Sequence, residues 1–170
     1  MSKATYSISS ILVIFIIVLT VFSFRTEESI IEQAGEKAKE IFYNEEVPED
    51  NYHGEYFSFY LPSNMEVEEV DDFNAILQNG HRTLIVFYNK LESNDSNLNY
   101  EAAKTEDAAL LESFTDDNKF GYIRLLQDEE HMEYEIQVGV GGVKLTTYTT
   151  KNEIISDSEN LMKIALSIVQ

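Results

Sequence analysis

Three histidines are the first residues of this chain to consider for catalysis or metal binding. His53, His81 and His131 each lie next to a predicted loop or turn. No two of them have the i, i+4 spacing of a helical zinc site, and no His-Glu-x-x-His sequence occurs. We therefore interpret all three as exposed turn histidines, and the sequence predicts no zinc site.

Sequence motifs for nucleophiles and phosphate binding are also missing. The chain has no cysteine, which excludes a thiol nucleophile, a Cys-ligated zinc and a disulfide. Neither a Gly-x-Ser-x-Gly elbow nor a serine-lysine motif occurs. The segment 139–142 lacks the Lys-Ser/Thr ending of a phosphate loop and joins two predicted strands. The sequence therefore predicts no catalytic residue and no cofactor.

Carboxylates are the most abundant candidate ligands. The densest cluster comprises Glu66, Glu68, Glu69, Asp71 and Asp72, and smaller clusters lie in predicted turns at 116–117 and 128–130. Calcium prefers oxygen ligands, but no cluster has the Asp-x-Asp-x-Asp-Gly loop with its distal Glu. We interpret the clusters as a solvated surface with diffuse cation attraction, and a specific calcium site is the alternative.

Three other carboxylates lie among apolar residues. Glu133 and Glu135 alternate with apolar positions and are expected on the wet face of a strand. They could flank a glycosidic bond only if a cleft formed between them. Asp107 interrupts an apolar stripe, and an unpaired buried carboxylate is costly, so we expect it at a helix edge near Lys104.

The overall composition excludes two classes of protein. The 170 residues carry 12 Lys+Arg against 31 Asp+Glu, a formal charge of −19. Nucleic-acid binding needs a basic face and is not expected. With 44% hydrophobic and 12% aromatic residues, the chain is also too apolar for a disordered acidic polymer.

The N-terminal region reads as a membrane anchor. Residues 4–24 contain no charge and are bounded by Lys3 and Arg25, and as a helix they would span about 31 Å. A cleaved signal peptide is the alternative, but the best cleavage candidate, 21–23, is weak. We predict a single-pass anchor over residues 1–25, with the C-terminal domain outside the cytoplasm.

The positions of helices and strands follow from periodicity. A helix is predicted from Thr26, its cap, to about Asn44, and the segment 26–51 then forms a juxtamembrane helix and linker. Its apolar stripe favours packing on its own domain over pairing with a partner helix. In the body, strands are predicted at 56–61, 65–70, 74–77, 83–88, 120–126, 132–140 and 143–150. Helices are predicted at 98–114 and at the C-terminal end, where Ser156 or Asp157 is the predicted cap.

This order predicts an α+β fold, an antiparallel sheet with helices packed on it, over residues 52–170. Asn79-Gly80 marks a tight hairpin, and the strand at 83–88 is apolar on both faces, which indicates a central position. About 120 residues can form a compact core, so a fragment starting near Asp50 is expected to fold alone.

The block Tyr56-Phe-Ser-Phe-Tyr-Leu-Pro62 resembles the opening strand and proline of Mog1/PsbP-like domains. The order of the later elements, ending with the helix at 161–168, is similar to that superfamily. The aromatic residue that often follows the proline is absent, since Ser63-Asn-Met65 stands there. The resemblance implies a fold and an accessory or binding role, and it identifies no catalytic residue.

These observations together predict a membrane-anchored accessory or binding domain of the cell envelope with a protein or peptide partner. It is not expected to be an enzyme. One alternative is a membrane-anchored hydrolase that uses carboxylates. The other is a secreted protein that binds a cation or a hydrophobic ligand.

Overall fold

The computed structural model describes residues 12–15, 27–44, 46–128, 130–131 and 133–169. Most of the predicted anchor, its cleavage candidate and the predicted cap Thr26 lie outside these residues. Residues 12–15 are helical, and their side chains are more than half exposed. Among the described helices, none has both the length and the apolar character needed to cross a membrane.

A seven-stranded sheet organises the body, and every neighbouring pair of strands is antiparallel. Its order, from one edge to the other, is β3 (Glu66–Val70), β4 (Asn74–Asn79), β5 (Arg82–Tyr88), β9 (Val143–Thr149), β8 (Glu133–Val140), β7 (Phe120–Asp128) and β6 (Ala108–Thr115). A separate two-stranded ribbon pairs β1 (Tyr52–His53) with β2 (Ser58–Phe59). The predicted α+β class with an antiparallel sheet is confirmed.

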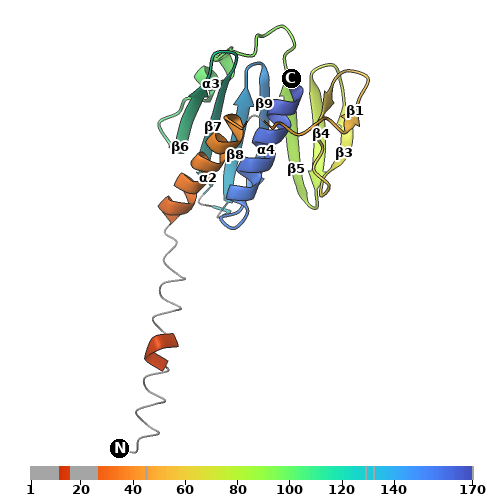
Figure 1. Ribbon diagram of the computed structural model, residues 1–170. Helices are drawn as coiled ribbons and strands as arrows, with labels where there is room; N and C mark the ends of the chain where they lie inside the picture. Colours follow the sequence, from red (N-terminus) through yellow and green to blue (C-terminus); the bar gives the residue numbers. More distant parts are fainter. Residues whose placement is uncertain (1–11, 16–26, 45, 129, 132, 170) are drawn as a thin grey trace, which may run out of the picture.

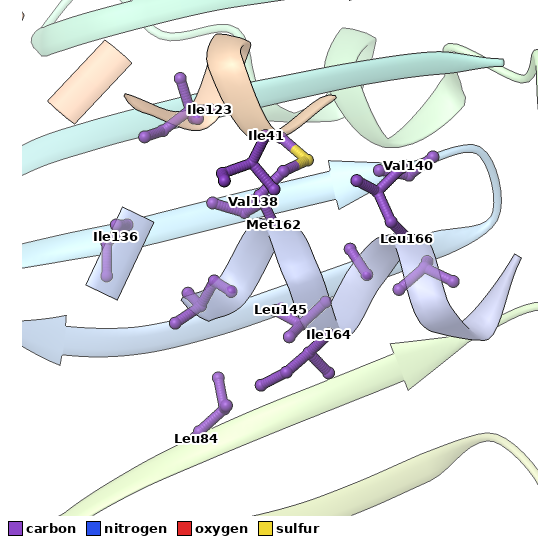
Figure 2. Packing of buried hydrophobic residues seen from close by; sticks show 14 of the residues in the cluster. Ile41, Leu84, Ile123, Ile136, Val138, Val140, Leu145, Met162, Ile164 and Leu166 are labelled. Carbon is purple, nitrogen blue, oxygen red and sulfur yellow. The ribbon is translucent and has the colours of Figure 1, made fainter. Parts of the chain in front are cut away.

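Two long helices, α2 (Glu27–Phe42) and α4 (Ile154–Ile168), lie side by side across one face of this sheet (Figure 1). We call this the inner face. Alternation along β8 turns Ile136, Val138 and Val140 toward the helices, where they are fully buried. Figure 2 shows side chains of both helices and of the central strands converging in this core.

The first helix is part of this core. The buried residues of α2 are Ile30, Ala34, Gly35, Ala38, Ile41 and Phe42. Its first turn is also bonded to the sheet, because Glu27 accepts hydrogen bonds from the Gln127 amide (3.0 Å) and the Tyr134 hydroxyl. The interpretation of this segment as a helix that packs on its own domain is confirmed.

The predicted helix at 98–114 is wrong beyond residue 103. α3 ends at Ala103, and residues 108–115 form the edge strand β6, paired with β7. Ala, Leu and Glu in this segment favour a helix locally, but the pairing with β7 overrides that preference. Asp107 is exposed in the intervening turn, and Lys104 pairs with Glu101 at 2.8 Å instead.

Other elements match the prediction with shifts. The β4–β5 hairpin forms with Gly80 at φ +63°, and its loop residues are Gly80 and His81. The predicted strand at 56–61 shrinks to the two residues of β2. α4 begins at Ile154, ahead of the predicted caps, and Asp157 is buried within its first turn.

Candidate binding surface

The structure places the three histidines at exposed positions. His53 lies in β1, His81 in the β4–β5 turn and His131 in the turn after β7. His131 Nδ1 lies 2.9 Å from Asp128 Oδ2, and His53 Nδ1 lies 3.4 Å from Asp50 Oδ2. Across the described residues, no group of three or more His, Asp and Glu side chains could hold a metal ion.

The acidic clusters contain carboxylates that stabilise turns. Asp71 accepts hydrogen bonds from the backbone N–H groups of Phe73 (2.8 Å) and Asn74 (2.7 Å), and these bonds hold its pKa below the ordinary value. Asp116 is bonded in the same way by Lys119, which also lowers its pKa. Both carboxylates stabilise turns by accepting hydrogen bonds from the backbone, and this role does not require a bound cation.

The outer face of the sheet is divided into two halves. α3 (Leu98–Ala103) covers the half formed by β7 and β8, where the Tyr100 ring lies 5.4 Å from the Phe120 ring and 5.9 Å from the Tyr122 ring. The Tyr122 hydroxyl donates to Gln137 Oε1 at 2.8 Å, and burial raises its pKa. This half is therefore filled by the protein itself.

Glu135 belongs to this covered half. Its side chain is 28% exposed and forms an ion pair with Arg124, whose guanidinium also donates to the Ala103 carbonyl at 3.3 Å. Glu135 was predicted on the solvent-exposed face of its strand, but it is partly buried and paired with Arg124. Glu135 therefore holds Arg124 in place, and Arg124 attaches the end of α3 to the sheet.

The other half of the outer face carries apolar side chains that none of the described helices covers. Register places Ile76 of β4 directly opposite Ile85 of β5, and Phe87 of β5 opposite Lys144 of β9. The Lys144 ammonium lies 5.5 Å from the centre of the Phe87 ring. Ile85 is 50% exposed and Tyr148 is 49% exposed. We call these five residues the open face.

A hollow of about 180 Å³ lies at the β3 side of the open face. Its apolar lining comes from Ile76 and Ile85, and its polar lining from Glu69, Asp71 and Asn74. Glu69 pairs with Ile76 across the β3–β4 ladder, so a carboxylate stands beside an apolar floor. An apolar stem that ends in a cationic group, as in lysine or arginine, has the chemistry that fits this hollow.

A larger and more polar groove of about 470 Å³ lies beside the C-terminal end of α4. Its lining includes Asp50, Tyr56, Tyr88 and Lys90. The Lys90 ammonium donates to the carbonyl of Tyr56 within the same groove. Because that charge is already engaged, the groove offers less directed chemistry than the open face.

Comparisons with protein-family models, with curated proteins and with solved structures found no match to this chain. The resemblance to Mog1/PsbP-like domains stays a prediction from the sequence. Sequence reasoning did not identify the open face. Its signal was present in the strand at 83–88, which is apolar on both faces. That pattern was interpreted only as a sign of a central strand, and β5 does lie between β4 and β9 in the sheet.

Proposed function

We propose that this chain is a single-pass membrane protein of the cell envelope whose extracytoplasmic domain binds a protein or peptide through the open face. The observation that carries the proposal is the apolar surface of Ile76, Ile85, Phe87 and Tyr148 on adjacent strands. Antiparallel sheets with one uncovered face normally present polar residues there. Contiguous exposed apolar residues bordered by polar ones are typical of interaction surfaces.

The border of the open face indicates the chemistry of the partner. Glu69 and Asp71 line the hollow at its β3 side, and the chain as a whole carries a charge of −19. A complementary surface therefore presents apolar side chains with lysine or arginine beside them. Attraction between opposite charges speeds association, and burial of the apolar groups keeps the complex together.

Site-specific photo-crosslinking tests the proposal in the full-length chain in its native membrane. A photoreactive amino acid at Thr83, which is exposed and pairs with the outer-face residue Gln78, should yield one discrete adduct. Ile85→Asp should abolish that adduct. The matched control is Leu91→Asp, a change at a 93% exposed loop residue, which should leave the adduct unchanged.

Two results would overturn this assignment. One is the absence of any adduct from Thr83, and the other is an adduct that survives Ile85→Asp at full yield. In either case the open face would not be the binding surface.

The anchor is tested separately. Protease added to intact cells should digest the body if, as we propose, the domain lies outside the cytoplasm. Full protection of the body would contradict this orientation. Terminal sequencing of the mature protein distinguishes a retained anchor from a cleaved signal peptide, and we expect the N-terminal segment to be retained.

A further inference from the structure

The two edges of the sheet differ in how well they are protected against further pairing. β3 has five residues, three of them exposed glutamates, and a bulge between Val67 and Glu69. Charge, short length and bulges are the usual protection of an edge strand. β6 has eight residues, of which only Glu112 is charged, and its one irregularity lies near the start, between Ala108 and Leu110.

The backbone of β6 presents free hydrogen-bonding groups to solvent. Residues in an antiparallel ladder turn their N–H and C=O groups alternately toward the neighbouring strand and away from it. Thr115 turns outward, because its N–H donates to the Tyr43 hydroxyl (3.3 Å) and that hydroxyl donates to its carbonyl (3.1 Å). Ser113 and Leu111 therefore turn outward as well. Among the described residues, none forms a hydrogen bond with these outward groups.

An acidic ridge of α2 borders this edge. Tyr43 shows which side of the helix lies above the edge, because its hydroxyl reaches Thr115. Glu36, Glu32 and Glu28 precede Tyr43 by 7, 11 and 15 residues, spacings that place them on the same side, and all three are exposed. Lys39, 3.7 Å from Glu36, is the nearest basic group on the ridge.

Glu112, on β6 itself, adds a further carboxylate beside α2. A Cβ at Gly35 would lie 3.1 Å from Glu112 Oε2, so the Glu112 carboxylate also faces α2.

We propose that β6 is a docking edge for an extended segment of a partner protein with basic side chains at alternating positions. The segment adds an eighth strand by hydrogen bonding to Leu111 and Ser113. Its basic side chains point to the inner side and lie along the acidic ridge, while its other side chains continue the outer face. This edge lies across the sheet from the open face, so the two surfaces can be occupied independently.

A second copy of this chain fits the edge poorly. Antiparallel pairing of two β6 strands would bring two acidic ridges together. It would also place the two starts of α2 at opposite ends of the joined sheet, because α2 starts beside Gln127 and Tyr134 at one end of the strands. Two chains anchored in one membrane cannot adopt that arrangement, an argument that rests on the anchor proposed above.

The test uses the full-length chain in detergent micelles and the synthetic peptide acetyl-Val-Lys-Val-Lys-Val-Lys-Val-amide. In the free chain, the amides of Leu111 and Ser113 should exchange with solvent faster than those of Glu112 and Phe114. On peptide binding, their exchange should slow by about tenfold or more. Protection of both amides in the free chain, at dilutions where it is monomeric, would overturn the proposal.

Two N-methylated versions of the peptide provide matched controls that leave the protein unchanged. Methyl groups on the alternate nitrogens that face β6 should abolish binding, whereas methyl groups on the remaining nitrogens should not. Equal binding of both versions would show that no strand pairing occurs. Appearance of a dimer whose β6 amides are protected without peptide would assign the edge to a second copy and overturn the basic segment as occupant.

Charge reversal tests the acidic ridge. Glu32→Lys combined with Glu36→Lys should weaken peptide binding by about tenfold, because two attractive contacts become repulsive. Glu66→Lys combined with Asp72→Lys makes the same change of charge on the opposite side of the sheet, at exposed residues that do not line the hollow of the open face, and should leave binding nearly unchanged. If both pairs weaken binding equally, the peptide responds to net charge alone and the assignment of β6 fails. The photo-crosslink at the open face is expected to form whatever the outcome here.

Discussion

A fragment that begins at Asp50 lacks α2 and tests what holds this domain together. The helix buries three large apolar side chains, Ile30, Ile41 and Phe42, and the last of these is fully buried. At about 1.5–3 kcal/mol for each, their loss costs about 5–9 kcal/mol. Domains of this size have total stabilities of about 5–15 kcal/mol. The fragment also exposes the surfaces of β6, β7 and α4 that the helix covers.

We therefore expect residues 50–170 to show no cooperative thermal transition by circular dichroism, whereas residues 27–170 should melt cooperatively. This is the opposite of the autonomous folding that the sequence suggested. A single substitution gives a graded version of the test. Phe42 packs on Phe114 with ring centres 5.6 Å apart and fills the space beside Gly121, so Phe42→Ala should cost about 3–5 kcal/mol.

For a chain of this length, that cost lowers the melting temperature by roughly 6–20 °C. Glu36→Ala, on the exposed side of the same helix, is the control and should change the free energy of unfolding by less than about 0.5 kcal/mol. The reasoning is refuted if the 50–170 fragment melts cooperatively within a few degrees of the longer one. It is also refuted if the two substitutions have equal effects.

Three further predictions concern charges. Asp157→Ala removes the buried carboxylate that lies 2.5 Å from the guanidinium of Arg82 and leaves only Glu153 beside it, at 3.5 Å. It should lower the free energy of unfolding in urea by about 3 kcal/mol. The hydrogen bond from Lys119 holds the pKa of Asp116 below its ordinary value. The ionised Asp116 side chain therefore contributes its full stabilisation above about pH 4, and this stabilisation is lost as the pH falls through the lowered pKa. Asp116→Asn should accordingly show a smaller drop in melting temperature than the parent between about pH 5 and pH 2. The charge of −19 predicts that moderate sodium chloride raises the melting temperature, and that micromolar calcium adds no more than magnesium does; a rise of several degrees with micromolar calcium alone would indicate a specific site.

The sequence predicted those elements whose signal is local and unopposed. Alternation over residues 132–140 predicted a strand, and the structure has β8 at Glu133–Val140. Gly80 supplies the positive φ that a two-residue hairpin needs, and the β4–β5 turn forms there. The stripe of α2 follows from the 3.6-residue period, and its apolar positions are buried apart from Ile31, which is partly buried.

Tertiary pairing decided the segment from Ala108 to Thr115. Its residues are good helix formers, and a stripe of apolar positions continues the helical period from Tyr100. Backbone hydrogen bonds to β7 outweigh those local preferences, each of which is worth only a fraction of a kcal/mol. The edge strand, and with it the docking edge that we propose, could not be found from local pattern because strand pairing joins residues without a fixed sequence spacing.

Burial of individual residues was likewise decided only by the assembled sheet. Ser156 or Asp157 was predicted to cap the last helix, but the helix begins at Ile154, and the fold brings Arg82, 75 residues away in sequence, and Thr149 to the carboxylate of Asp157. Leu84 and Ile85 are adjacent and equally apolar, yet Leu84 is 2% exposed and Ile85 is 50% exposed. Alternation tells which residues share a face, whereas burial depends on which element packs over that face. In this protein α2 and α4 cover the inner face (Figure 1), whereas α3 has six residues and packs on the β7 side of the outer face.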